Sequence, residues 1–559
     1  MIPAALVAGL LLAAPARAAE ARFDWFDYQG HDPAGALAGV VAGPGEYRNP
    51  ILTGFHPDPS ITRVGEDYYL VTSTFAYFPG LPVFHSRDLV TWTQIGNAID
   101  RPTQLDFSGL GLSRAVFAPD ITWRDGTFYI LNTCVDCGEN YYLTAKDPAG
   151  PWSDPVWIKD VAGIDPSFFF DDDGRTYLLN NGEPEGPALY QGHRAIWMQE
   201  FDLKAQKPVG PRKVLVNGGV DLSKKPIWIE GPHILKKDGW YILTCAEGGT
   251  AEGHSQVVLR SRDVWGPYEP YAGNPILTQR DLPRNRPNPV TSAGHADLVD
   301  TPSGEWWASF LATRPYAGDF YNTGRETFLL PVTWKDGWPV ILENGREIPL
   351  THARPKLPPA PPARIPLSGD FAVREDFDGP DLGPHWMTLR TPKSVWRRFA
   401  GGALALQARA EPLGSKGQPS YVGRRQQHMD ATAATRVDFT PAHDGDRAGL
   451  AALQSEDFFY LLSVGRDDGR RVVRLERRTG EGEPPHGTVV AQAPLPANGP
   501  VDLRIEARGG RYDFAYATRP GAWTTLVRDA DGTMLSTKTA GGFVGVTFGL
   551  YAYSPEPSE

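Results

Sequence analysis

The sequence predicts an all-β protein, a five-bladed β-propeller followed by a jelly-roll β-sandwich. Sixty glycines, 52 prolines and an aromatic share of 11% in 559 residues are typical of short strands joined by tight turns. One sequence pattern occurs five times before residue 343, and a proline-rich stretch then separates it from a second strand-rich region. The chain is long enough for two or three domains with substantial cores.

The repeated unit opens with a carboxylate, continues through an apolar strand, turns, and resumes with paired aromatic residues. The units begin at Asp58, Asp120, Asp165, Glu230 and Asp297. Their turns are Gly65-Glu66-Asp67, Asp125-Gly126, Asp173-Gly174, Asp238-Gly239 and Ser303-Gly304. Asp-Gly turns between apolar runs favour hairpins. A repeat of roughly 50 to 65 residues fits one four-stranded propeller blade with its loop. The alternative is an all-β sandwich with acids scattered on its rim.

The N-terminus predicts export to the periplasm or the medium. Residues 1–18 are typical of a signal peptide, because an apolar run is followed by Ala16-Arg17-Ala18, a small-x-small cleavage site, although the usual basic start is missing. The apolar run is too short for a membrane span. Residues 19–47 show no clear element and are interpreted as a lead-in to the propeller, which we place at 48–343.

A linker and a second domain follow the propeller. Residues 344–373 contain six prolines between positions 355 and 366, typical of a semi-rigid, polyproline-like linker. Residues 374–559 alternate apolar and polar residues with period two, as in Val501-Asp502-Leu503-Arg504-Ile505, which predicts the sandwich. This domain has no dense set of acids, so we do not expect the chemistry there.

Charge and cysteine content narrow the possible partners. Lysine and arginine number 55 against 66 acids, a formal charge of −11, which argues against nucleic acid or an anionic membrane. Neutral sugars suit an acidic protein. Cys134 and Cys137 form a C-x-x-C, but only Cys245 remains, too few for a zinc site. The pair is either a small disulfide formed after export or two buried thiols.

Three acids stand out because the residues around them are rigid. Asp58 lies between two prolines, Asp165 precedes Pro166, and Glu230 precedes Gly231-Pro232. Acids at the starts of inner propeller strands converge on one mouth of the channel. Glycoside hydrolysis needs one carboxylic acid and a second group that delivers water or attacks, and a third acid can raise a neighbour's pKa. An isolated Asp before Pro is commonly only a turn residue. The denser run Asp171-Asp172-Asp173 is interpreted as a solvated hairpin turn.

These motifs resemble glycoside hydrolase family 43, whose members are β-xylosidases and α-L-arabinofuranosidases with a five-bladed propeller. The similarity covers about residues 48–343. It is carried by Phe55-His56-Pro57-Asp58-Pro59-Ser60, Gly163-Ile164-Asp165-Pro166-Ser167 and Ile229-Glu230-Gly231-Pro232-His233, with support from Glu247-Gly248-Gly249-Thr250, Gly294-His295-Ala296-Asp297 and Gly324-Arg325-Glu326-Thr327. The C-terminal part is similar to the concanavalin A-like sandwich that follows the propeller in the family's xylosidase branch.

The resemblance implies an inverting mechanism and a role for each acid. Asp58 would be the general base, Glu230 the general acid, and Asp165 the residue that orients the acid and raises its pKa. Inversion places the two carboxyl groups about 6.5–9.5 Å apart, to admit a water.

The resemblance also implies substrate contacts and a possible ion. Phe75, Phe117, Thr250 and Arg325 would bind the sugar. His295 matches the family's central histidine, which often faces a calcium ion or a water. No cofactor is required, and a structural calcium in the channel is possible.

Two features concern the pocket's outer parts. Many relatives have tryptophan where this chain has Phe117, which offers less stacking area and no N–H donor. In the xylosidase branch a C-terminal loop covers the pocket, and Asp457-Phe458-Phe459-Tyr460 is our candidate, with an ordinary strand as the alternative.

The leading functional hypothesis is an exo-acting enzyme that releases β-1,4-linked xylose from xylo-oligosaccharides or xylan. An α-L-arabinofuranosidase, or one enzyme with both activities, is close behind, because the two pentoses present similar hydroxyl patterns. An endo-acting arabinanase would need an open groove. A non-catalytic carbohydrate-binding protein would not need three acids on inner strands.

Overall fold

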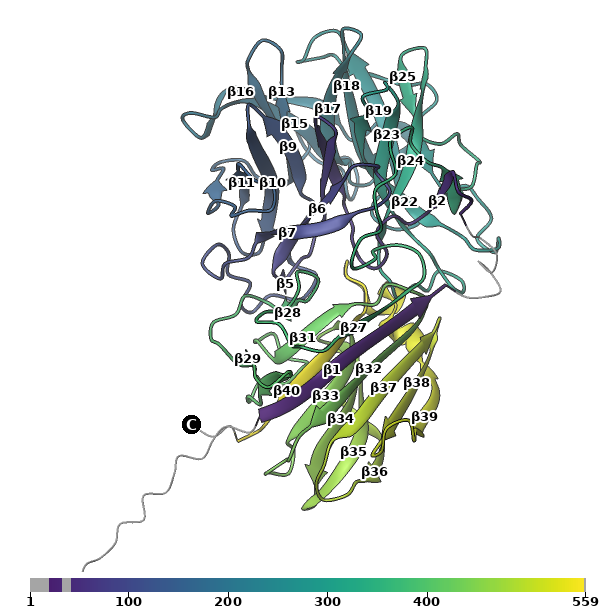
Figure 1. The fold of residues 1–559 in the computed structure, drawn as a ribbon. Coiled ribbons are helices and arrows are strands. Elements are labelled where there is room, and N and C mark those ends of the chain that lie inside the picture. The colour runs from purple at the N-terminus through teal and green to yellow at the C-terminus, as the bar shows by residue number, and fades with distance from the viewer. Residues whose placement is uncertain (1–19, 33–41, 557–559) are drawn as a thin grey trace, which may run out of the picture.

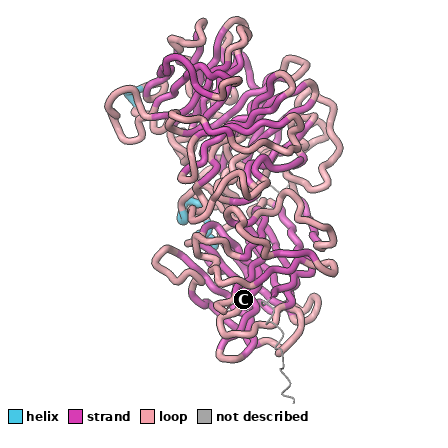
Figure 2. The backbone as a smooth tube through the Cα atoms, turned by 90° about the vertical axis from the view of Figure 1, so that its left-hand side faces the viewer, coloured by secondary structure: helices cyan, strands magenta, loops and turns pink. Residues whose placement is uncertain are grey.

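The computed structural model describes residues 20–32 and 42–556 and shows two β-rich bodies joined by several chain segments (Figure 1). Helical structure in these residues is limited to α1 (Thr537–Ala540) and the 3-10 turns η1 (Leu222–Lys224) and η2 (Gly532–Leu535). The view turned by 90° shows strands throughout both bodies (Figure 2). No helix among the described residues is long and apolar enough to cross a membrane.

Five antiparallel sheets form the upper body, one for each predicted unit. Each has four strands in chain order, apart from β5 (Tyr77–Phe78), which lies outside the first sheet, and two short additions, β8 (Ala115–Val116) and β21 (Leu277–Thr278). The five sheets are β3 (Ser60–Val64), β4 (Asp67–Val71), β6 (Gly80–Ser86) and β7 (Thr93–Ile99); β9 (Asp120–Arg124), β10 (Thr127–Val135), β11 (Asn140–Ala145) and β12 (Val156–Trp157); β13 (Ile164–Phe170), β14 (Thr176–Gly182), β15 (Ala195–Asp202) and β16 (Lys207–Asn217); β17 (Glu230–Lys237), β18 (Trp240–Glu247), β19 (Ser255–Ser261) and β20 (Glu269–Pro270); and β22 (Thr291–Asp300), β23 (Trp306–Thr313), β24 (Glu326–Lys335) and β25 (Trp338–Val340).

The first strands of the sheets close into a ring. β3 contacts β9, β9 contacts β13, β13 contacts β17, β17 contacts β22, and β22 returns to β3. Each of these strands is joined to the second strand of its sheet by one of the predicted hairpin turns. Val64 is paired with Asp67 in the first sheet, and Lys237 with Trp240 in the fourth. The five-bladed propeller is therefore confirmed, and the rim-acid sandwich alternative is wrong.

The acidic run in the third blade is only partly a solvated turn. Asp172 and Asp173 are exposed, but Asp171 is buried, which corrects the prediction for that residue. Its carboxylate accepts hydrogen bonds from Lys236 Nζ at 2.8 Å and Tyr241 Oη at 2.7 Å, both on the next blade. A buried carboxylate needs such partners. Asp171 thus joins two blades, which a hairpin pattern within one blade does not reveal.

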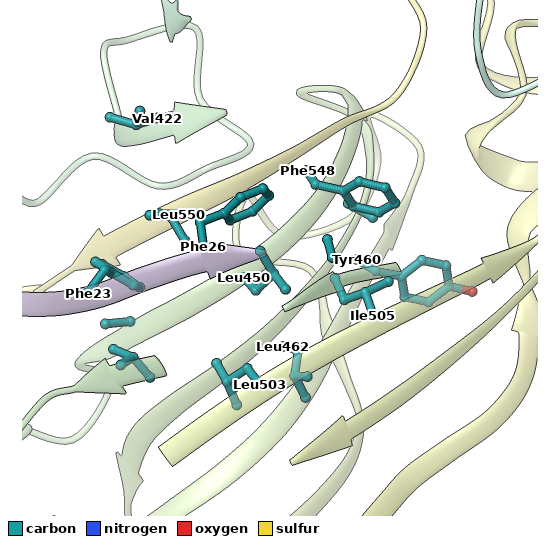
Figure 3. Close-up of a cluster of buried hydrophobic side chains, with 14 of the residues drawn as sticks. Phe23, Phe26, Val422, Leu450, Tyr460, Leu462, Leu503, Ile505, Phe548 and Leu550 are labelled. Atoms are coloured by element: carbon teal, nitrogen blue, oxygen red, sulfur yellow. The ribbon is translucent and has the colours of Figure 1, made fainter. Parts of the chain in front are cut away.

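The lower body is a sandwich of two antiparallel sheets. One has the order β29-β30-β1-β32-β37-β38-β39, with β27 also paired to β1, and the other has the order β31-β40-β33-β34-β35-β36. Apolar side chains from both inner faces meet between the sheets, among them Phe26, Leu450, Ile505 and Phe548 (Figure 3). The strands are β1 (Glu20–His31), β27 (Phe371–Glu375), β29 (Arg397–Phe399), β30 (Leu404–Gln407), β31 (Ser420–Arg425), β32 (Asp430–Asp438), β33 (Arg447–Ser455), β34 (Phe458–Asp467), β35 (Arg470–Thr479), β36 (Thr488–Pro494), β37 (Val501–Arg508), β38 (Arg511–Ala517), β39 (Thr524–Asp531) and β40 (Thr547–Tyr553).

Strand β1 overturns the interpretation of residues 19–47 as a lead-in without clear elements. It is a 12-residue strand inside the sandwich, with β32 on one side and β30 and β27 on the other. Its inner face buries Phe23, Phe26 and Tyr28. A short strand, β2 (Glu46–Arg48), pairs with β26 (Thr351–Ala353) beside the propeller. The sandwich is therefore built from both ends of the chain. The predicted signal peptide and residues 33–41 lie outside the described residues.

The proline-rich segment packs along the propeller. The Ala360 N–H donates to Asp88 Oδ2 at 2.9 Å, Arg354 pairs with the same oxygen at 2.7 Å, and Ser368 Oγ donates to the Pro50 carbonyl. The two bodies also share a buried cluster that includes Phe55 and Tyr551, and β28 (Thr388–Leu389) pairs with β5 of the propeller. These contacts position a sandwich loop against the propeller mouth.

Candidate active site

A cavity of about 320 Å³ lies where the inner propeller strands begin, on the side facing the sandwich. All eight residues to which the sequence assigned a role line it: Asp58, Phe75, Phe117, Asp165, Glu230, Thr250, His295 and Arg325. Asp58 comes two residues before β3, Asp165 is the second residue of β13, and Glu230 is the first of β17. The topology thus brings together acids that lie far apart in the sequence.

Asp58 is surrounded by positive charges and by hydrogen-bond donors. It is 5% exposed, accepts a hydrogen bond from Ser73 Oγ at 2.5 Å and pairs with Arg325 Nη1 at 2.9 Å. Burial raises the pKa of Asp58, but Arg325, His295 and the Ser73 hydrogen bond outweigh it and hold the pKa below its usual value. Asp58 is therefore a carboxylate at neutral pH.

Glu230 has the opposite environment at almost the same exposure, 7%. Its pKa is raised to about 8, mainly by burial and further by the negative charges of Asp165 and Asp58. The positive charges of His295 and Arg325 lower the pKa but do not outweigh these causes. Glu230 therefore keeps its proton at neutral pH.

Asp165 links Glu230's strand to the histidine of the fifth blade. Its Oδ2 accepts the Gly231 N–H at 3.1 Å and lies 3.7 Å from His295 Nε2. Burial lowers the pKa of His295, but Asp165 and Asp58 outweigh it and raise the pKa to about 9. A Cβ on Gly231 would lie 2.8 Å from the His295 ring, and Gly231 has φ +56°, so only glycine suits this position.

Backbone strain concentrates around the cavity. Five of its lining residues that are not glycine have positive φ: Asp58, Phe75, Asp165, Trp228 and His295, all between 51° and 55°. Such conformations are costly for side chains with a Cβ and persist where surrounding structure enforces them, commonly at functional sites.

The cavity wall includes an aromatic residue from the sandwich that the sequence interpretation missed. The Phe543 ring stacks on Phe75 at 5.7 Å, meets Phe117 edge-on at 5.7 Å, and lies 5.4 Å from the Arg325 guanidinium. The backbone N–H of Phe543 donates a hydrogen bond to Ser113 Oγ at 2.9 Å, across the boundary between the propeller and the sandwich.

The covering-loop candidate Asp457-Phe458-Phe459-Tyr460 is wrong. Residues from Phe458 onward form β34, Tyr460 packs in the sandwich core, and none of the four lines the cavity. Phe543 occupies that role, after Gly541 and Gly542, which both have positive φ. The only sequence feature that could have indicated this loop is the pair of adjacent glycines before an aromatic residue. Arg114, Ala118, Ile164, Trp228 and Gly249 also line the cavity without having been predicted.

Deeper in the ring lies one grouping of possible metal ligands among the described residues, Asp120, His233 and Asp297. His233 Nδ1 lies 3.4 Å from Asp120 and 3.9 Å from Asp297, whose other oxygen accepts bonds from Ser60 Oγ and the Ile61 N–H. Burial lowers the pKa of His233, but the two carboxylates outweigh it and raise the pKa.

A calcium ion does not fit this grouping. Calcium takes six to eight oxygen ligands, whereas this grouping offers two carboxylates and an imidazole nitrogen. His295 is outside the grouping and faces Asp165. A calcium beside His295 stays a prediction, and no step proposed below depends on it.

The Cys134–Cys137 pair is bridged, whereas Cys245 is free and buried. The disulfide closes a small loop after β10, on the second blade. None of the three cysteines lines the cavity, so thiol chemistry takes no part in the site.

Comparison with known proteins agrees with this geometry. The family model described as glycosyl hydrolases family 43 matches residues 47–339, and that of the β-xylosidase C-terminal concanavalin A-like domain matches residues 374–559. A xylosidase/arabinosidase of Butyrivibrio fibrisolvens is 39% identical over 520 residues, 90% of this chain and 95% of that protein. A non-reducing end α-L-arabinofuranosidase of Bacteroides ovatus is 38% identical, over 92% of this chain and 93% of that one.

Solved structures show the same two-domain arrangement. A GH43_12 protein from a capybara gut metagenome has a TM-score of 0.88 at 38% identity and covers 96% of this chain and 100% of its own. The xylan β-1,4-xylosidase of Bacillus halodurans has a TM-score of 0.82 at 33% identity, covering 91% and 97%. The chain therefore belongs to glycosyl hydrolase family 43 and is a glycoside hydrolase with a C-terminal concanavalin A-like domain.

Proposed function

We propose that this enzyme removes single terminal pentoses, principally β-1,4-linked xylose, from the non-reducing ends of xylo-oligosaccharides or xylan, with inversion. One observation carries the proposal: a single cavity holds two buried carboxyl groups, Asp58 and Glu230, whose pKa values are shifted in opposite directions. An ionised base and a protonated acid at one site are what inverting hydrolysis of a glycoside requires.

In the proposed reaction, the Asp58 carboxylate takes a proton from a water as that water attacks the anomeric carbon. Glu230 gives its proton to the glycosidic oxygen, so the leaving sugar departs as a neutral alcohol. Asp165 helps to keep Glu230 protonated and holds the adjacent Gly231 N–H. The released sugar has the opposite anomeric configuration to the bond that was cleaved.

The cavity supports exo action. Phe75 and Phe543 would pack against the terminal sugar, with Phe117 and Thr250 nearby, and Arg325 would hydrogen-bond its hydroxyls while it pairs with Asp58. Phe543 walls the cavity from the sandwich side, which argues against the open groove of an endo-acting arabinanase. A non-catalytic sugar-binding protein would have no use for the opposed acid and base.

The second candidate activity is α-L-arabinofuranosidase, alone or together with xylosidase. It is favoured by the names of relatives, a xylosidase/arabinosidase and an arabinofuranosidase, at nearly equal identity. Hydrolysis of 4-nitrophenyl β-D-xylopyranoside and 4-nitrophenyl α-L-arabinofuranoside, compared by kcat/KM, separates the two. NMR of the xylose first released from 4-nitrophenyl β-D-xylopyranoside, whose leaving group is not a sugar, should show the α-anomer, and initial release of β-xylose would contradict inversion.

Export also belongs to the proposal. It is supported by the apolar residues 1–18 and by the Cys134–Cys137 disulfide, a bond typical of oxidising compartments. Cleavage before Ala19 leaves all of β1 in the mature chain. Mass spectrometry of the periplasmic and secreted fractions should find a chain starting at Ala19, and an intact Met1 in a cytoplasmic fraction would contradict export.

A further inference from the structure

We propose that Trp228 is the stacking platform of a subsite for the leaving-group sugar, which makes the enzyme prefer oligosaccharides to substrates with small leaving groups. This inference rests on the function proposed above and deepens it. A xylopyranose ring has equatorial hydroxyls and apolar C–H faces, so it packs well against a flat aromatic side chain.

The position of Trp228 fits the leaving-group side. It lines the same cavity as Glu230 and precedes it by two residues. A general acid must lie beside the oxygen that it protonates, so a side chain next to Glu230 at the mouth lies next to the departing sugar. Phe75 is 1% exposed and Trp228 is 37% exposed, so the cavity runs from a buried floor to a partly open mouth.

The Trp228 ring is held by a second layer of contacts. The Arg194 guanidinium lies 4.7 Å from the ring centroid. Arg194 in turn donates twice to Asn181 Oδ1, at 3.2 and 3.1 Å, and pairs with Glu183. Asn181 also donates to the Ile229 carbonyl at 2.6 Å. A partly exposed ring fixed by a cation is pre-ordered for stacking and loses little freedom on binding.

The backbone of Trp228 is fixed in a conformation that its size disfavours. Its φ is +51°, and its N–H donates to the Gly192 carbonyl at 2.9 Å. A Cβ on Gly192 would lie 2.7 Å from Ile227 and 3.5 Å from Trp228, so glycine allows the two loops to approach. A bulky residue at positive φ is a strained feature. Trp228 shares it with Asp58, Phe75, Asp165 and His295 in the same cavity.

A second exposed apolar side chain, Ile227, directly precedes Trp228. Ile227 is 46% exposed and lies between Gly192 and Gly249, a lining residue of the cavity. An exposed aromatic and an exposed aliphatic side chain in succession suit a chain of two or more sugars beyond the cleaved bond. With the proposed xylosidase function, the ligand class is a β-1,4-linked pyranose oligosaccharide.

The test compares two substrates in several full-length variants. Xylotriose places sugars against Trp228, whereas β-xylosyl fluoride has a leaving group too small to reach it. For Trp228→Ala we expect the ratio of kcat/KM for xylotriose to that for the fluoride to fall about tenfold. Trp228→Phe should lose less, and Arg194→Ala about two- to threefold, because only the support of the ring is removed. Trp123→Ala is the matched control, since Trp123 is 38% exposed but does not line the cavity.

The outcomes separate this inference from the proposed function. If Trp228→Ala lowers both values of kcat/KM equally, or changes neither, the inference is wrong while the xylosidase function stands. A wild-type enzyme that hydrolyses neither substrate would overturn the proposed function, and this inference with it. Thermal unfolding of each variant shows whether it is folded. If Trp228→Ala is unfolded, the ratio of kcat/KM for xylotriose to that for the fluoride is measured for Trp228→Phe instead, and an unchanged ratio contradicts the inference.

Discussion

Asp58 and Glu230 occupy one cavity, are buried to nearly the same degree, and have opposite protonation states at neutral pH. Asp58 receives a hydrogen bond from Ser73 and the charge of Arg325, whereas Glu230 has burial and the negative charge of Asp165 as its largest influences. Burial alone therefore does not decide which carboxyl group is the base. The charged and hydrogen-bonding neighbours of each carboxyl group decide it.

The largest expected effect comes from removing the base. Asp58→Asn should lower kcat on xylobiose by about 10³- to 10⁴-fold, because no carboxylate remains to take the water's proton. Steady-state kinetics checks this, with Ser73→Ala as the milder comparison, since it removes one hydrogen bond to the same carboxylate. An Asp58→Asn enzyme within tenfold of wild type would exclude Asp58 as the base.

Removing the acid should depend on the leaving group. Glu230→Gln should lose about 10²- to 10⁴-fold on xylobiose but far less on 2,4-dinitrophenyl β-xyloside, whose leaving group departs without a proton. Asp58→Asn should lose similar factors on both substrates. Measuring kcat/KM for the two substrates in both variants sharpens the comparison. Equal losses on both substrates for Glu230→Gln would remove its assignment as the acid.

Asp165→Asn should alter the pH profile. Without the negative charge of Asp165, the pKa of Glu230 falls from about 8, so the basic limb of kcat/KM moves to lower pH, by about one unit. This shift alone lowers activity at pH 7 by about twofold and activity at pH 8 and above by five- to about tenfold. Asp171→Asn is the control, because Asp171 is a buried acid outside the cavity. A basic limb that stays in place would show that Asp165 does not set the pKa of Glu230.

A further expected effect is on stability rather than on activity. The folded-state pKa of Glu230 is raised from 4.5 to about 8, so its contribution is fully present below pH 4.5 and declines as pH rises toward 8. Glu230→Gln does not titrate. Its free energy of unfolding, relative to wild type, should therefore rise by a few kcal/mol between pH 4.5 and 8. Urea unfolding at several pH values measures this, and a constant difference would contradict the buried, protonated state.

The propeller and the three acids could be predicted from the sequence because each signal is local, whereas Phe75, Phe117, Thr250, Arg325 and His295 were predicted through the resemblance to a known family. A proline or glycine lies beside the acid in four of the five blades, and a hairpin turn follows a few residues later in all five. The topology then needs only the rule that inner strands surround one axis. The roles of these residues remain proposals that the variants above test.

The missed features all depend on partners distant in sequence. The Tyr28 hydroxyl of β1 bonds to His428 Nδ1 at 2.8 Å, 400 residues away. Phe543 has no chemical signature until the sandwich docks beside Phe75. Asp171 resembled a solvated turn because its partners, Lys236 and Tyr241, are on another blade. Periodicity within one segment cannot show such pairings.

The position of β1 has a practical consequence for anyone who shortens this gene. A fragment beginning at the propeller, near residue 47, would leave β32, β30 and β27 facing an empty slot in the middle of their sheet. The exposed edges would invite self-association. Phe543 belongs to the same sandwich. Removing fewer than fifty N-terminal residues would therefore destabilise the part of the cavity wall that Phe543, close to the C-terminus, provides.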